Sequence, residues 1–530
     1  MAERNKHVPV MLPVRGLNTI EPLTIDWNSG FAREFTNYVL YNGRVYVRPA
    51  IRRDTYNSNL NEGIVWFDVT TKSSGWYVIT AGGNIRKLSD NSGASGIGGT
   101  PSYNATQCKH SSLDLVIGLR EPRAVTNPFG AWSFTTLGIT ATDIRAACSH
   151  RHRLYVCNAN TIEYSTIDAI TGTMDGSFSL ASLLDGQNIL RMFSVTISPA
   201  DTTQNVLAIF GDGGKVLVYQ GDYPNSANWS IIGKFDMPRP PTNVMFLEID
   251  GDIFVGGRDY AYWFRDLFNG GAQAAYLNSP SAPIQNIWQG SAWTSNSSVH
   301  YNRYLDAIVV HYANVSQYVP PIDYSAIAAF NTYTQISFAY FKRYKAWAVW
   351  LSPWSFQWPV IADGVTTGSN LYGVNSNSGI FVSTPGSIVD QFSLAGVSAD
   401  HSIEATWKTP YYPEKDRGHK LSNARVFFEN TVSGYFEKIR AIFDFSDYNS
   451  QFGWYTQSTV TAVNPANYVD SALDVTAVSS NQYNQLTGVS GRGGTFSLQL
   501  TQKSKSGASA SHYQSIYGAT LYLEDGSSLF

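Results

Sequence analysis

Cysteine is scarce in this sequence. The 530 residues include three cysteines, Cys108, Cys148 and Cys157. An odd number this small cannot build a disulfide framework for a chain of this length, which argues against the class of disulfide-rich secreted proteins. We expect synthesis in a reducing compartment.

Charge is scarce as well. Asp, Glu, Lys and Arg make up 15% of the residues, whereas about 25% is typical of soluble domains. The formal net charge is −3 and the isoelectric point is near 6.3. The chain therefore lacks the strongly basic footprint of nucleic-acid-binding domains, and any contact with DNA is expected to be local or loose.

Long apolar runs and helical periodicity are nearly absent. No run reaches the length of about 18 residues that indicates a membrane span, and residues 1–16 carry charges without the apolar core of a signal peptide. We therefore expect no membrane insertion and no conventional secretion. Residues 31–40 are the best short helical candidate. Residues 268–298 are predicted to be an irregular insertion.

Short hairpin patterns recur along the chain, and aromatic residues are abundant at 14%. Each pattern has a β-branched or aromatic run, a turn rich in Gly and Asn, and a second such run. These turn residues tolerate the positive φ that tight β-turns require, so the pattern predicts hairpins. The predicted strand pairs are 76–80 with 85–88, 154–157 with 161–164, 206–210 with 215–219, and 371–374 with 380–382.

The spacing of the predicted strands indicates a radial array. Apolar triplets that begin at Tyr77, Leu115 and Tyr155 are 38 and 40 residues apart, and a four-stranded propeller blade commonly takes about 40 to 50 residues. Later steps are longer, as loop insertions would make them. The sequence predicts an all-β fold, an irregular β-propeller of six to eight blades whose closure leaves few exposed sheet edges.

The pattern changes near residue 397, where longer alternating strands begin. Such strands are typical of a sandwich-like sheet. We predict three regions. Residues 1–60 form an N-terminal segment that packs with the C-terminal sheet region, residues 61–396 form the propeller with inserted loops, and residues 397–530 form a C-terminal sandwich-like domain.

One internal match suggests either a metal site or a duplicated strand. Cys108-Lys-His110 returns 40 residues later as Cys148-Ser-His150, with His152 nearby. Residues two apart on a strand share a face, so neighbouring blades could bring these side chains together around zinc. The spacing matches none of the common zinc patterns. We therefore favour a duplicated blade edge and predict no metal.

The sequence offers no convincing catalytic constellation. Paired carboxylates of a glycosidase could come from turn aspartates, but turn aspartates usually bind their own backbone. Residues 221–229 resemble a sialidase Asp-box turn, yet the Asp-to-Trp spacing is two residues too long. A nucleophile elbow and a phosphate-binding loop are both missing. We predict no enzyme activity, no cofactor, and no catalytic, cofactor-binding or metal residues. The aspartates considered are Asp212, Asp222, Asp250, Asp252 and Asp259.

Basic and aromatic clusters remain as candidates for contacts. Residues 48–53, 342–345 and 415–420 are basic and could touch DNA phosphates or an acidic partner, although solvated faces are commoner. The aromatic stretches 347–350 and 354–358 are expected to be core or subunit interface rather than a ligand platform.

Several segments resemble one family of viral proteins. Residues 13–22 and 41–49 look like the opening of the tail nozzle proteins of short-tailed bacteriophages, also called tail tubular protein B. The stretch from Val206 to Pro224, continuing to Pro240, resembles the most recognisable part of that family. Residues 372–381, 404–410 and 420–425 are also similar.

The resemblance implies a structural virion protein. Such a protein would form a closed homo-oligomeric ring, a hexamer, at the distal end of the phage tail, where it retains packaged DNA and conducts it during ejection. Its implied partners are copies of itself, a tail adaptor protein, tail fibre or tail tip proteins, and viral double-stranded DNA in transient contact. Its implied location is the virion tail, after synthesis in the bacterial cytoplasm.

Two other functions stay open from the residues alone. The first is a monomeric glycan-binding or glycan-cleaving propeller that serves as a receptor-binding protein. It requires paired carboxylates about 5 to 9 Å apart. The second is an intracellular propeller scaffold that binds peptides on one face.

Overall fold

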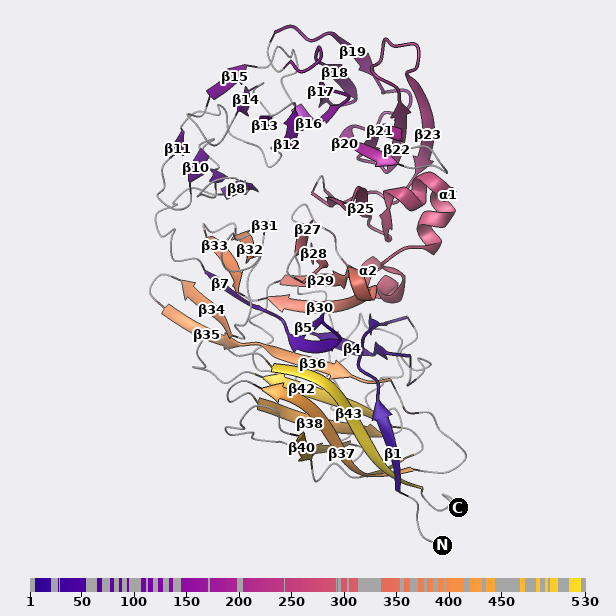
Figure 1. Cartoon of the computed structure of the whole chain (residues 1–530), viewed down its shortest axis with the longest axis vertical. Coiled ribbons are helices and arrows are strands. Elements are labelled where there is room, and N and C mark those ends of the chain that lie inside the picture. Colours follow the sequence, from indigo (N-terminus) through magenta and orange to yellow (C-terminus); the bar gives the residue numbers. More distant parts are fainter. Residues whose placement is uncertain are drawn as a thin grey trace.

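The computed structural model describes most of the chain between residues 5 and 525. The described ranges are 5–20, 27, 29–53, 64–68, 77–80, 85–87, 93–94, 106–110, 113–117, 123–126, 133–136, 144–169, 172–197, 204–242, 244–291, 293, 297–302, 305–312, 335–352, 357–362, 370–375, 379–384, 389–394, 397–410, 412, 419–430, 435–443, 468–471, 483–486, 491–493, 496–503 and 514–525. Figure 1 shows a ring of small sheets above a second group of longer strands.

The first four sheets of the ring are four-stranded antiparallel meanders, the usual form of a propeller blade. Blade 1 is β8 (Ile64–Asp68), β9 (Tyr77–Thr80), β10 (Ile85–Lys87) and β11 (Gly93–Ala94). Blade 2 is β12 (Thr106–His110), β13 (Leu113–Ile117), β14 (Arg123–Thr126) and β15 (Ser133–Thr136). Blade 3 is β16 (Ile144–His150), β17 (Arg153–Asn158), β18 (Thr161–Tyr164) and β19 (Gly176–Ser179). Blade 4 is β20 (Ile189–Ile197), β21 (Gln204–Gly211), β22 (Lys215–Gln220) and β23 (Ser230–Asp236).

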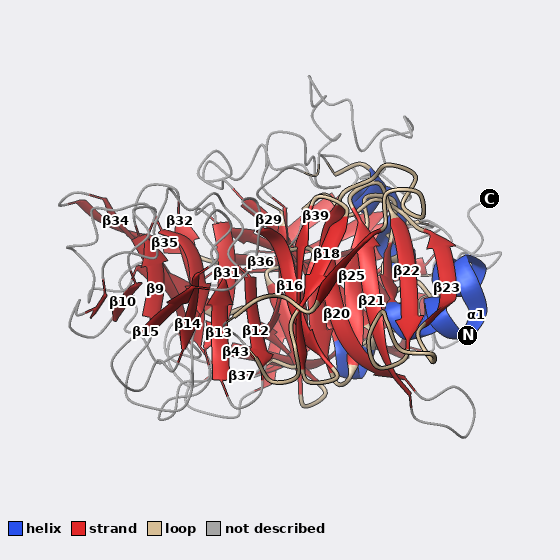
Figure 2. Ribbon diagram, turned by 90° about the horizontal axis from the view of Figure 1, so that it is seen from above, coloured by secondary structure: helices blue, strands red, loops and turns tan. Residues whose placement is uncertain are grey.

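Blade 5 has three strands and then a helix. Its strands are β24 (Phe246–Ile249), β25 (Asp252–Gly256) and β26 (Ala261–Trp263), and α1 (Phe264–Leu277) follows directly. The helix buries Phe264 and Leu267, three residues apart on one face, and contacts β23, β25 and β26. Figure 2 shows it at one end of the molecule. The prediction of an irregular insertion over residues 268–298 was wrong here, because the segment holds most of α1 and also η2 (Ala282–Ile284) and α2 (Gln285–Gln289).

The last two blades close the ring. Blade 6 is β27 (Ser298–Asn302), β28 (Ala307–Tyr312), β29 (Gln335–Phe341) and β30 (Ala346–Ser352). Blade 7 is β31 (Gln357–Ala362), β32 (Asn370–Asn375), β33 (Gly379–Thr384) and, as its fourth strand, β7 (Ala50–Arg53) from near the N-terminus. Because β31 contacts β8 of blade 1, the last blade returns to the first, and the described residues form seven blades arranged in a ring (Figure 1). The predicted all-β propeller of six to eight blades is confirmed by this strand pairing.

The longer strands form two further sheets. One joins β1 (Asn5–Val10), β5 (Tyr38–Tyr41), β6 (Arg44–Val47), β37 (His419–Asn430), β40 (Tyr483–Leu486), β41 (Gly491–Gly493) and β43 (Gln514–Asp525). The other joins β4 (Glu34–Thr36), β36 (Glu404–Lys408), β38 (Tyr435–Phe443), β39 (Tyr468–Ser471) and β42 (Phe496–Lys503). We call these two sheets the sandwich region. The predicted helix at residues 31–40 was wrong, because β3 (Phe31–Ala32), β4 and β5 lie there.

Two sheets run without a break from the propeller into the strands beyond it. In blade 6, β30 pairs in parallel with β4, and β4 pairs with β36, so blade and sandwich sheet form one eleven-stranded sheet. In blade 7, β7 pairs in parallel with β34 (Val389–Leu394), which pairs with β35 (Val397–Ser402). A single hydrophobic cluster extends from Val8 and Leu523 in the sandwich region to Trp288 and Phe338 in the propeller. Backbone hydrogen bonds and a common core therefore join the two parts.

Candidate functional site

Three of the five turn aspartates hold loops together. The Asp212 carboxylate accepts hydrogen bonds from the backbone N–H (3.1 Å) and the side-chain amide (3.2 Å) of Asn188. The Asp222 carboxylate accepts one from the Asn228 side chain at 2.9 Å. The Asp252 carboxylate accepts two from backbone N–H groups, those of Ile253 (2.7 Å) and Arg265 (3.0 Å). These bonds satisfy backbone and amide donors in turns and give the three side chains structural roles.

A small cavity on blade 5 is lined by three aspartates, Asp250, Asp252 and Asp266. It has a volume of about 290 Å³. Burial raises the pKa of Asp252 and the pKa of Asp266 above their usual range. Carboxyl groups with raised pKa values occur in active sites, although structural carboxyls share the property. The lining residues are Ile249, Asp250, Asp252, Trp263, Arg265 and Asp266.

The other two turn aspartates, Asp250 and Asp259, have different surroundings. The Asp250 carboxylate forms an ion pair with Lys342 in the turn between β29 and β30. Asp259 is exposed, and its main-chain oxygen accepts a hydrogen bond from Gln285 (3.5 Å). The cavity is therefore lined by three carboxyl groups, the guanidinium of Arg265 and the indole of Trp263.

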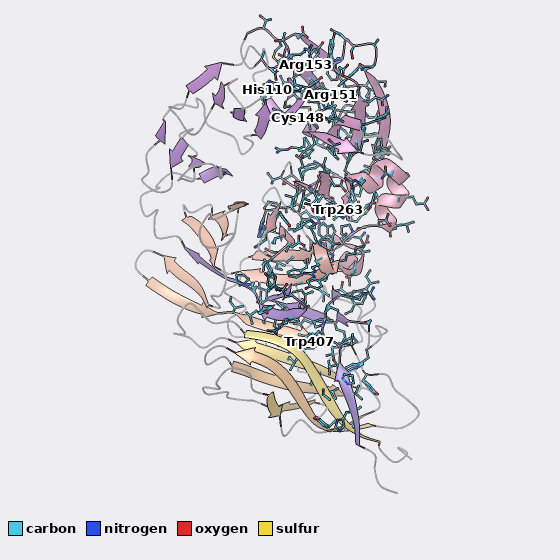
Figure 3. All side chains as sticks on the ribbon, viewed as in Figure 1. His110, Cys148, Arg151, Arg153, Trp263 and Trp407 are labelled. Carbon is cyan, nitrogen blue, oxygen red and sulfur yellow. The ribbon has the colours of Figure 1, made fainter. Side chains whose placement is uncertain are left out.

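The repeated Cys-x-His pattern marks equivalent strands of consecutive blades. His110 ends β12 and pairs with Leu113, and His150 ends β16 and pairs with Arg153 in the same register. The strand pairing thus agrees with a duplicated blade edge. His152 lies apart from this arrangement, exposed and 3.3 Å from the Asp168 carboxylate. Figure 3 shows His110 and Cys148 on adjacent blades.

Each of the two strand-end histidines contacts a serine of the next blade. His110 Nδ1 lies 2.9 Å from Ser149 Oγ, and His150 Nδ1 lies 2.9 Å from Ser194 Oγ. Both imidazoles are buried, at 0% and 1% exposure. Over the residues that the structure describes, no group of three or more His, Cys, Asp or Glu is placed to hold a metal ion.

The basic cluster at residues 48–53 does not present Arg48 to a phosphate. The Arg48 side chain is 1% exposed, Nε donates to Asn37 Oδ1 (3.0 Å), and a terminal nitrogen donates to the Leu351 carbonyl oxygen (2.6 Å). Arg48 therefore fits neither a DNA or partner contact nor the solvated face that was the commoner expectation, because its charge is enclosed at the joint between β30 and the N-terminal strands. The side chains of Arg52 and Arg53 lie outside the described residues.

The second basic cluster is divided between an ion pair and the surface. Lys342 pairs with Asp250 and lies 3.8 Å from Asp306, whereas Arg343 and Lys345 are exposed. Of the third cluster, residues 415–418 lie outside the described residues, and only the backbone of residues 419 and 420 is described.

The aromatic stretch 347–350 belongs to the core. Trp347 is fully buried and its indole N–H donates to the Pro280 carbonyl oxygen (2.5 Å), while the indole N–H of Trp350 donates to the Tyr38 carbonyl oxygen (2.9 Å). The core alternative is therefore correct for this stretch. Side chains of the stretch 354–358 lie outside the described residues.

The sequence did not predict the buried hydrogen bonds that join β30 to the N-terminal strands. Asn37 is fully buried in the left-handed region with φ of 57°, its backbone N–H donates to the Val349 carbonyl oxygen (2.7 Å), and its side-chain oxygen accepts from the Leu351 N–H (2.8 Å). Arg48 binds the same side-chain oxygen. The only signal in the sequence was an Asn in a strand-rich segment, which commonly marks positive φ.

Comparisons with known proteins do not identify a family. No protein-family model matches the chain, and a search of curated proteins found no match. Among solved structures, the chain is similar to crystal structures of BBS1N in complex with ARL6DN, one soaked with lead and one with mercury. In each case the identity is 10%, the TM-score is 0.38, and the match covers 64% of this chain and 98% of the other. No helix in the described ranges combines the length and the apolar character needed to cross a bilayer.

Proposed function

We propose that this protein is a structural subunit of a short-tailed phage tail nozzle, which assembles into a closed ring of six copies, retains packaged DNA and conducts it during ejection. The observation that carries the proposal is the pair of sheets shared by the propeller and the strands beyond it. A subunit without a flexible linker can transmit load and hold a fixed angle to its neighbours. A ring that confines DNA needs both properties.

The resemblance to nozzle proteins falls partly on residues that fix this joint. Residues 13–22 include Gly16, where β2 (Gly16–Leu17) pairs with Trp347 of β30. Residues 41–49 include Arg48, which binds Leu351 of the same strand. The stretch around residues 206–224 covers the hairpin of β21 and β22 in blade 4. A family defined by a rigid subunit would be expected to share residues at such places.

Exposed apolar side chains near the two helices support assembly. Tyr276 and Leu277 at the end of α1 are 51% and 69% exposed, and Ile20 is 51% exposed. Ile20 follows Thr19, whose N–H donates to the Pro283 carbonyl oxygen next to α2. Contact with a neighbouring subunit would remove such apolar area from water. In a cyclic ring the contacts are heterologous, so a different surface of the neighbour would cover this one.

In this proposal the protein has no catalytic role. Its partners are further copies of the chain, a tail adaptor protein, fibre or tip proteins and, transiently, double-stranded DNA. Its location is the virion tail. The modest net charge of −3 suits a conduit along which DNA slides, because a strongly basic wall would bind phosphates.

Electron microscopy of the purified protein tests the proposal directly. We expect class averages of closed rings with six-fold symmetry around an axial opening, and mass photometry at six times the monomer mass of 58.4 kDa. A monodisperse monomer, or particles without rotational symmetry, would contradict the proposed ring.

The acidic cavity on blade 5 favours glycan binding as a second candidate, because carboxylates beside an indole are a common arrangement for sugar recognition. This alternative predicts saturable binding of host surface polysaccharide that Trp263→Ala abolishes. Tyr276→Ala, which changes an exposed aromatic on α1, is the matched control. Under the nozzle proposal we expect no saturable binding by either variant or by the unmodified protein, measured by isothermal titration calorimetry.

A further inference from the structure

Blade 3 is joined to both neighbouring blades by matching side-chain contacts. On one side His110 of blade 2 reaches Ser149 of β16, and on the other His150 of β16 reaches Ser194 of β20. We call these two contacts the His–Ser clasps. Ser194 Oγ also donates to Asn205 Oδ1 at 2.9 Å, which anchors the second clasp in blade 4.

The charged surroundings of the two histidines are also equivalent. Besides burial, which lowers the pKa of His110, the described residues of blade 3 act on it. The Asp168 carboxylate and the Ala169 backbone raise this pKa, and His152 lowers it. Besides burial, which lowers the pKa of His150, the Gly221 backbone and Asp222 raise this pKa and Arg151 lowers it. In both cases an aspartate and a backbone group come from the loop between the third and fourth strands of the following blade. Both aspartates are engaged elsewhere, Asp168 with His152 and Asp222 with Asn228.

Burial makes the neutral form of each clasp histidine the favoured one. It lowers the pKa of His150 from its usual value to about 4, and the neighbouring Gly221 backbone and Asp222 only partly oppose this effect. Burial lowers the pKa of His110 in the same way, against the attraction of Asp168. A proton taken up by either ring places a buried charge at the interface between two blades, which we call a seam. Exposure of the ring to water removes the free-energy cost of that buried charge.

Different interactions stabilise the seams between blades and the sheets of the blades themselves. Within blade 3, backbone ladders join consecutive strands. Blades 3 and 4, in contrast, form separate sheets whose strands contact through side chains, with one backbone hydrogen bond between them, from the Ile189 N–H of β20 to the Ala159 carbonyl oxygen (2.7 Å). Opening a seam therefore breaks no backbone ladder and should need less free energy than unfolding a blade. Blade 6 also has buried histidines, His300 and His311, but both lie within one sheet.

We propose that the two His–Ser clasps make the seams on either side of blade 3 the acid-sensitive part of this propeller, so that proton uptake by His110 and His150 separates blade 3 from blades 2 and 4 while blade 6 and the sandwich region stay folded. The device does not depend on the nozzle function, because it follows from the clasps alone.

Hydrogen exchange followed by mass spectrometry tests the proposal on the full chain. If the opened seam restores the ordinary His pKa of about 6.5, His150 alone raises the open population about 20-fold between pH 7 and pH 5. We expect a loss of protection of about that size, after correction for intrinsic exchange, in peptides from β16 and β20. Peptides from β30 and β43 should lose less than about twofold.

Histidine variants test whether the two clasps cause the loss of protection at low pH. The double variant His110→Gln and His150→Gln keeps a hydrogen-bonding side chain that cannot titrate, so the loss of protection between pH 7 and pH 5 should disappear. His7→Gln is the matched control, because that histidine is exposed on β1 of the sandwich region, and it should behave like the unmodified protein.

Trp229 gives a second readout, measured as the difference in emission between the unmodified protein and Trp229→Phe, because the chain has 14 tryptophans. Its ring lies 6.3 Å from that of His150 and is stacked on Tyr155 and Tyr219. Acid should shift the tryptophan emission reversibly. The proposal is overturned if protection is lost equally in β16, β30 and β43 of the unmodified protein, or if the double glutamine variant responds to acid as the unmodified protein does.

Discussion

Arg48→Met should lower the free energy of unfolding by about 3 to 5 kcal/mol, the largest effect that we expect from a single side-chain substitution in this protein. Methionine keeps much of the volume but removes the guanidinium. The Asn37 side-chain oxygen and the Leu351 carbonyl oxygen then lose buried donors in the joint between blade 6 and the N-terminal strands. Hydrogen bonds from a charged donor contribute about 1.5 to 3 kcal/mol each, and the Asn37 side-chain oxygen keeps only its bond from the Leu351 N–H. Urea unfolding followed by circular dichroism measures the change.

Arg343→Met is the matched control for this prediction. It makes the same chemical change at an exposed position on the turn between β29 and β30. Surface substitutions usually change stability by less than about 0.5 kcal/mol. Equal effects of the two variants would mean that the buried arginine does not support the joint.

Gly16→Ala should destabilise the protein by about 3 kcal/mol, because two independent costs add at one position. A Cβ at residue 16 would lie 2.5 Å from both the backbone nitrogen and the carbonyl oxygen of Trp347, and 2.9 Å from Ala346 Cβ. Backbone atoms of a central strand cannot move aside as a flexible side chain can. The φ of 70° at Gly16 is also unfavourable for alanine. The midpoint of thermal unfolding reports the loss.

Gly43→Ala separates the two costs of the Gly16 substitution. Gly43 has a similar φ of 73°, but a Cβ there would meet nothing within 4 Å. We expect a loss of about 1 kcal/mol from the backbone conformation alone. If both alanine variants lost the same stability, close packing of β2 against β30 would not be the reason that residue 16 is glycine.

The hairpins could be predicted because their signals are local. The predicted pair 206–210 with 215–219 corresponds to β21 and β22, and the pair 154–157 with 161–164 to β17 and β18. In β17 and β18, Ala159 adopts a φ of 49° at the turn between two asparagines. A tight turn places its demands on two or three adjacent residues, so composition reveals it.

The helical prediction at residues 31–40 and the missed helix α1 have a common cause. A short apolar run fits a strand as well as a helix, and pairing with distant partners decides between them. Here Phe35 pairs with the distant Trp407, and Leu40 pairs with Val45 across a short hairpin, and both pairings select strands. Most of α1 lies in the predicted irregular insertion, and Gly271 interrupts its helical backbone with φ of 72°. Packing against β25 and β26 supports the helix on either side.

The candidate sites could also be predicted only in part from the sequence. The repeat of His110 and His150 was visible as a sequence match, since equivalent strands in consecutive blades need the same residue at the same register position. Its use as a contact between blades was not visible, because Ser149 and Ser194 reach those rings only when the blades pack. The acidic cavity likewise brings Asp252 and Asp266 together from a hairpin turn and a helix.

By itself the sequence determined the local ribbons of this protein: the turns, the strands beside them, the repeat from blade to blade and the all-β character that follows. Only the tertiary structure decided that β7 completes a blade formed mainly by residues more than 300 positions later, and that β4 extends blade 6 into the sandwich region. The physical reason is that ladders between strands are made by backbone groups common to all residues, so a distant pairing leaves little trace in residue type. The entropy of closing such a long loop rises only slowly with its length, and burial of a common core can offset it.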